Sequence, residues 1–234
     1  MKRSTLAALV AALTLVPLGL VACGGDDDEA AAPAATAAET QAEETTSGDA
    51  VSIESPAVDL RLAVDRLLAE HALLATFAMQ KGVAGEEDFE AIAAALEGNT
   101  VDLGEAIGSV YGEEGKTAFL KLWRDHIGFF VDYTVATAKE DEAGQQAARD
   151  ELAQYQADFS AFLDTATEGN LPQSGAAEAL QAHVNQLITA LDTYAAGDYP
   201  KAYEQIREAY HHMYMTADAL AGAVVSQMPE QFGS

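Results

Sequence analysis

Five histidines, all between residues 71 and 212, are the side chains of this sequence whose type and spacing best suit chemistry. His71, His126 and His183 recur at intervals of 55 and 57 residues, each beside an apolar stretch. Helical periodicity places each of them on or next to an apolar stripe, so we expect three imidazoles that face the interior. Several imidazoles in one layer would suit a transition metal or an axially ligated haem.

A helical hairpin places residues that are equally far from its turn side by side. With a turn at Gly197-Asp198, His212 lies opposite His183, and this predicts a fourth member of the same layer. Imidazole and thioether groups together favour copper, and His211 and Met215 are expected to form a secondary pair on the opposite surface. The predicted metal ligands are His183, His212, His126, His71, His211 and Met215.

The same histidines also admit a structural interpretation. Buried imidazoles usually bond to a tyrosine hydroxyl, to a backbone carbonyl or to a carboxylate such as Glu70 or Asp125. A duplicated helical unit would copy such a residue three times without any ligand. Three hypotheses therefore stay open. The domain could bind a metal such as copper, it could be a helical scaffold that binds an envelope protein or peptide, or it could be a haem or redox protein.

The elements that would position these side chains are helices. From about residue 57 the apolar spacing is helical, and clusters of Gly, Asn and Pro interrupt it at regular intervals. We predict an all-α domain over 57–232, built as a bundle or a short stack of three helical hairpins. The predicted helices are 57–81, 86–110, 114–139, 142–167, 175–196 and 199–227, and the predicted hairpin repeats are 57–111, 112–168 and 174–228.

The last predicted helix carries several tyrosines at helical spacing. Tyr199, Tyr203 and Tyr210 fall on one stripe with Met213, and we expect this stripe to face the core. Asp198 is the predicted N-cap of the same helix.

The only cysteine, Cys23, identifies the amino-terminal region as a targeting segment. It follows Leu20-Val21-Ala22, a short apolar run and the basic residues Lys2 and Arg3, an arrangement that resembles a bacterial lipobox. Residues 1–22 are the predicted signal peptide, with lipid attached to Cys23. Residues 23–56, rich in Ala, Thr, Glu and Asp, are predicted to form a disordered acidic tether. We therefore expect a lipid-anchored protein on the extracytoplasmic face of the cell membrane.

Charge and motif content disfavour several classes of function. The formal net charge of −26 would repel phosphate, so nucleic acid is not an expected partner. Glu208-Ala-Tyr-His211 is the only Glu-x-x-His match, which is too few for a di-iron carboxylate bundle. The chain has no Gly-x-Ser-x-Gly motif, no phosphate-binding loop and no Cys-x-x-Cys-His motif. We therefore predict a binding protein that is not an enzyme.

Two segments carry a family resemblance. The runs WRDHIGFFVDYTVATAKED and AYHHMYMTADALAGAVVSQMPEQF resemble a helical domain of exported proteins and lipoproteins of Gram-positive bacteria that is often labelled copper amine oxidase-like. The resemblance spans about 57–232 and implies export and an all-α fold. Only the name of this domain suggests copper, because this chain has no counterpart to the β-rich catalytic domain of copper amine oxidases. The resemblance therefore implies no catalytic residue.

Overall fold

The computed structural model describes residues 54–232, and the predicted all-α fold is confirmed. Within this range there is no strand. The signal peptide, Cys23 and most of the predicted tether lie outside the described residues. The helices are α1 (Pro56–Ala84), α2 (Phe89–Ala138), α3 (Glu142–Ala166), α4 (Gln173–Ala195), α5 (Tyr199–Gln227) and α6 (Pro229–Phe232).

The helix ends lie where polar side chains and glycines predict them. The side chain of Ser55 accepts a hydrogen bond from the backbone N–H of Val58, and Pro56 occupies the first turn of α1. Asp198 accepts a hydrogen bond from the backbone N–H of Lys201, as expected for the N-cap of α5. These local interactions satisfy backbone groups that the helices themselves leave free.

Two predicted helices form the two arms of α2, which reverses direction at Gly112. This glycine has φ 74° and ψ −177°, a conformation outside the helical region. Lys116 and Glu105 form an ion pair across the turn, with Nζ and Oε1 2.6 Å apart. Further along, the Cα of Gly104 lies so close to the Leu120 side chain that a Cβ there would come within 2.8 Å of it. The arms, 89–111 and 113–138, therefore form a tight helical hairpin.

The conformation of Gly112 gives a testable prediction. We expect Gly112→Ala to lower the free energy of unfolding by about 1–3 kcal/mol, because a positive φ with extended ψ strains any residue that carries a Cβ. A Cβ at this position would meet nothing within 4 Å, so the cost comes from the backbone alone. The measurement is urea denaturation followed by circular dichroism.

A matched control for this variant is Gly98→Ala in the first arm of α2. The added Cβ also meets nothing within 4 Å, but the helical backbone favours alanine. This change should raise the stability by up to about 1 kcal/mol. Equal effects of the two substitutions would contradict the special role of the turn at Gly112.

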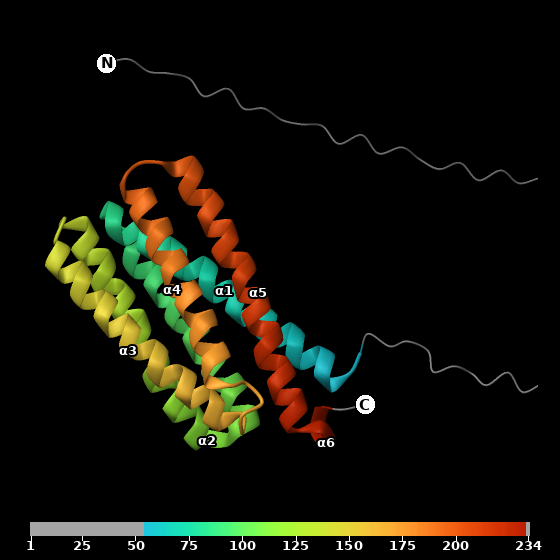
Figure 1. Ribbon diagram of the computed structural model, residues 1–234. Helices are drawn as coiled ribbons and strands as arrows, with labels where there is room; N and C mark the ends of the chain where they lie inside the picture. Colours follow the sequence, from blue (N-terminus) through green and yellow to red (C-terminus); the bar gives the residue numbers. More distant parts are fainter. Residues whose placement is uncertain (1–53, 233–234) are drawn as a thin grey trace, which may run out of the picture. The chain divides into compact units, whose positions relative to one another are not determined.

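The five long helices pack as a bundle (Figure 1). α1 contacts α2 and α5, while α4 lies between α3 and α5 and contacts both. The interior holds two large apolar clusters, one on each side of the middle of the bundle. The first includes Leu67, Leu68, Trp123, Phe159 and Met213, and the second includes Met79, Phe130, Tyr133, Leu152 and Leu187. The division of the domain into three repeats stays a prediction.

The predicted core stripe of α5 is wrong in its first half. Tyr199 and Tyr203 are 52% and 50% exposed, and Tyr210 is also exposed. The buried face of this half is formed instead by small residues, Ala202 and Ala209. Small side chains let α5 approach its neighbours closely, and the larger tyrosines then remain at the surface.

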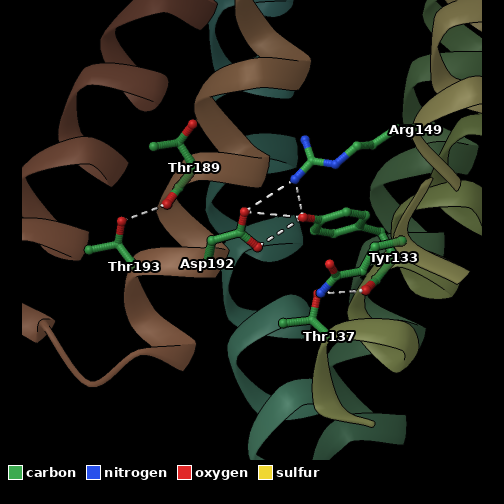
Figure 2. A network of polar contacts seen from close by, with 7 residues as sticks. Tyr133, Thr137, Arg149, Thr189, Asp192 and Thr193 are labelled. Carbon is green, nitrogen blue, oxygen red and sulfur yellow. Dashed lines mark hydrogen bonds and ion pairs between the residues drawn. The ribbon is translucent and has the colours of Figure 1, made fainter. Parts of the chain in front are cut away.

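A polar network joins three helices beside the second apolar cluster (Figure 2). The Tyr133 hydroxyl donates to the Asp192 carboxylate, 2.9 Å from Oδ1, and accepts a hydrogen bond from Arg149. Arg149 Nη2 also lies 3.3 Å from Asp192 Oδ2. Burial, helped by the hydrogen bond to Asp192, raises the pKa of Tyr133 to about 12. The neutral phenol therefore links α2, α3 and α4 throughout the physiological pH range.

Candidate functional site

Three helices bring His71, His126 and His183 together in the middle of the bundle. They come from α1, the second arm of α2, and α4. The ring centroid of His71 lies 5.5 Å from that of His126 and 6.3 Å from that of His183. The three side chains are 1%, 2% and 7% exposed, respectively. We call these three residues the histidine layer. On α2, His126 lies between Trp123 of the first cluster and Phe130 of the second, so the layer separates the two clusters.

Aromatic rings enclose the histidine layer. The Trp123 ring lies 4.7 Å from His71 and 4.6 Å from His126, measured between centroids. Tyr155 stacks on His126 with centroids 4.8 Å apart and an interplanar angle of 15°. In a helical hairpin, residues equally far from the turn lie side by side, and His126 and Tyr155 are such a pair about the turn between α2 and α3. The rings leave the imidazoles little room to be hydrated.

Burial makes all three imidazoles neutral. Desolvation, with a smaller effect of a neighbouring histidine, lowers the pKa of His126 to about 3 and that of His183 to about 4. The pKa of His71 is lowered well below its usual value, first by desolvation and then by His126 and His183. The carbonyls of Trp123 and Leu122 favour the charged form of His126 but do not outweigh burial. At pH 7 each ring therefore offers one N–H donor and one nitrogen acceptor.

The Nδ1 atoms of all three histidines are buried without a hydrogen-bond partner. The carbonyls of Trp123 and Leu122 lie close enough to His126 to favour its charged form, but neither forms a hydrogen bond of normal geometry with Nδ1. The two carboxylates that the structural interpretation proposes as partners are engaged elsewhere, since Glu70 accepts from Asn99 and Asp125 accepts from Lys121. The Nδ1 atoms therefore lack the protein partners expected of purely structural histidines.

The other predicted ligands lie near the histidine layer or at the surface. His212 is close enough to His183 to lower its pKa, but its Nε2 lies 3.0 Å from the carbonyl oxygen of Ala179 and so already has a partner. His211 and Met215 are exposed on α5. The structure thus groups three of the six predicted ligands closely, with His212 next to them, and leaves His211 and Met215 outside the group.

The donor types of the histidine layer suit a transition metal, but their present arrangement does not form a metal site. Within residues 54–232, no group of three or more His, Cys, Asp or Glu side chains is placed to hold a metal ion. The assignment of His71, His126, His183 and the other predicted residues as metal ligands stays a prediction.

An apolar cavity of about 220 Å³ adjoins the histidine layer. Its wall consists mainly of Leu, Ile, Val, Ala and Phe side chains of α1 to α5, together with Trp123, His126 and His183. Of the lining residues only Gly175, Met215 and Ala219 are exposed, so the cavity opens where the first turn of α4 faces α5. Small-molecule sites are usually concave and lined mainly by apolar side chains, as this cavity is.

The sequence pattern does not predict the cavity, and the helical stripe that contains Trp123 indicates only a core position for its ring. Trp123 does pack in the first apolar cluster, yet it also lines the cavity, and its Nε1 is buried without a hydrogen-bond partner. An indole N–H usually finds a partner when buried. The signal available in the sequence was the position of this tryptophan three residues before His126, which places both rings on one side of the helix.

Comparison with models of known protein families, with curated proteins and with solved structures gave no match. The resemblance to the helical lipoprotein domain therefore stays a prediction. None of the helices in residues 54–232 combines the length and the apolar composition that crossing a membrane requires.

Proposed function

We propose that this protein is a membrane-anchored extracytoplasmic lipoprotein whose helical domain binds a small apolar molecule in the cavity beside the histidine layer. The observation that carries the proposal is the cavity itself, because native interiors rarely contain voids larger than a water molecule. An engineered apolar cavity of about 150 Å³ binds benzene. The cavity described above, of about 220 Å³, has room for a somewhat larger molecule such as propylbenzene.

The anchor is the part of this proposal that depends on Cys23. A chain that carries acyl groups on this cysteine would sediment with membranes, whereas Cys23→Ser would release the protein into the soluble fraction. The acidic composition of residues 23–56 suits a spacer that keeps the domain away from an anionic surface.

Binding of propylbenzene to the purified protein tests the cavity. Trp123 is the only tryptophan and lines the cavity, so its fluorescence should change with a saturable 1:1 dependence on propylbenzene concentration. In the variant Ala176→Leu the larger side chain occupies part of the cavity, because Ala176 is a buried lining residue of α4. We expect this variant to bind propylbenzene at least tenfold more weakly.

The matched control is Ala195→Leu, the same change at an exposed residue of α4 that does not line the cavity. This variant should bind propylbenzene as the parent does. Failure of the parent to bind, or equal binding by Ala176→Leu, would argue against the cavity as the site. Circular dichroism of all three proteins verifies that they are folded.

A second candidate is binding of a transition metal such as copper, and the observation that favours it is the grouping of three neutral imidazoles with unpartnered Nδ1 atoms. Neutral imidazole is the form that ligates metals. Ring rotation would have to bring the nitrogens together. Copper loading, desalting and metal analysis by mass spectrometry test this candidate, with His183→Ala/His212→Ala as the comparison. Copper retained by the parent and absent from a folded double variant would support it, and no retained copper in either would count against it.

A further inference from the structure

The cavity beside the histidine layer is long in relation to its volume. Its wall runs from Gly175 to His183 on α4 and from His212 to Val224 on α5. At the rise of an α-helix these spans measure about 12 Å and about 18 Å. Since an apolar cavity of about 150 Å³ holds benzene, the volume of about 220 Å³ has room for roughly eight or nine carbon atoms. This shape suits one extended hydrocarbon chain and leaves no room for a second.

The inside of the cavity suits hydrocarbon and not charge. Apolar side chains form almost all of its wall, and among residues 54–232 no Asp, Glu, Lys or Arg lines it. The hydroxyl groups of Thr167 and Thr216 already donate to backbone carbonyls. A carboxylate or an ammonium group taken inside would lose its hydration without gaining an opposite charge. A charged group of any ligand therefore has to stay outside.

The cavity reaches solvent away from the histidine layer. Its exposed lining residues are Gly175, Met215 and Ala219, which we call the mouth. Gly175 lies in the first turn of α4, about 12 Å along the helix from His183. An extended chain of eight carbons spans roughly 9 Å, because its bonds measure about 1.5 Å and zigzag. A chain of this length therefore fits between the mouth and the histidine layer.

We propose that the cavity binds single-chain amphiphiles of about eight or nine carbons, such as a medium-chain fatty acid, with the tail inside and the hydrated head group at the mouth. The apolar wall holds the tail, and water solvates the head. Lipids with two long chains are excluded as ligands by the volume of the cavity. This inference rests on the proposed function and names the class of molecule that the same site binds.

Chain length and the number of charged ends test the inference by isothermal titration calorimetry at pH 7. The probes are octanoate, hexanoate and octanedioate, and octanoate should bind with 1:1 stoichiometry. Hexanoate should bind about 15-fold more weakly, because each buried CH₂ group contributes about a factor of four. Octanedioate should bind at least about 100-fold more weakly, because it carries a carboxylate at whichever end enters. Repeating the titrations in 0.5 M NaCl screens the repulsion between the dianion and the acidic protein.

A charge placed at the mouth locates the head group. In Ala219→Lys the new ammonium group should strengthen binding of octanoate and weaken binding of octyltrimethylammonium. Each effect should be about threefold for unit charges about 6 Å apart in water, so the ratio of the two affinities should change about tenfold. The matched control is Ala195→Lys, an equal change of net charge at an exposed residue of α4 about 30 Å along the helix from Gly175. This variant should keep the ratio of the parent.

The outcomes separate this inference from the proposed function. If propylbenzene binds but octanoate does not, or if octanedioate binds as tightly as octanoate in 0.5 M NaCl, the inference is overturned and the proposed function stands. The same ratio of affinities in Ala219→Lys and Ala195→Lys also overturns it, because the head group then does not lie at the mouth. If neither propylbenzene nor octanoate binds, or if Ala176→Leu binds them as the parent does, the proposed function fails together with the inference.

Discussion

Lowering the pH from 7 to 5 is expected to reduce the contribution of His126 and His183 to the free energy of unfolding by about 4 kcal/mol in total. Both groups have a pKa below the usual value of 6.5, about 3 for His126 and about 4 for His183. Between these values and 6.5 the unfolded chain binds protons that the folded protein does not, so stability falls as the pH falls. At pH 5 this amounts to about 2 kcal/mol for each histidine. The lowered pKa of His71 acts in the same direction.

Urea denaturation at pH 7 and pH 5, followed by circular dichroism, measures this dependence. Other groups also titrate in this range, and the raised pKa of Asp65 favours folding at low pH. The variant His126→Leu/His183→Leu keeps those groups but removes the two imidazoles. Its loss of stability between pH 7 and pH 5 should be smaller than that of the parent by about 4 kcal/mol. The same pH dependence in both proteins would show that the imidazoles do not control the acid sensitivity of the fold.

The fold could be predicted from sequence because its signals are local. Gly85, Gly169 and Gly197 have positive φ and follow helix ends, while Gly112 has positive φ at the turn within α2, and all four lie between helices that the sequence predicts. The meeting of His126 with Tyr155 also follows from local information, since two helices joined by a short turn leave few choices of register.

The parts that could not be predicted depend on packing between helices that are distant in the sequence. Tyr203 and Ala202 are neighbours in the chain, and helical periodicity alone cannot decide which of their two faces is buried. The small size of Ala202 decides it, because α5 can then pack closely on its neighbours. The cavity depends on the same distances between helix axes, which a single sequence does not specify.

The largest loss of stability from a single substitution is expected at Trp123. Its ring stacks on Phe119 with centroids 5.1 Å apart and contacts His71, His126 and Phe159. Trp123→Ala should lower the free energy of unfolding by about 3–5 kcal/mol, because it removes these contacts and leaves a void that joins the existing cavity. Urea denaturation at pH 7, monitored by circular dichroism because the only tryptophan is absent, measures the effect.

Trp123→Phe is the control that separates the ring from its N–H group. Phenylalanine keeps most of the aromatic contacts but lacks the donor, and in the free protein Nε1 has no partner to lose. The removal of an unpartnered buried donor offsets part of the lost volume, so the cost should be at most about 1.5 kcal/mol. If Trp123→Phe proved as damaging as Trp123→Ala, the indole N–H would have a strong partner within the protein.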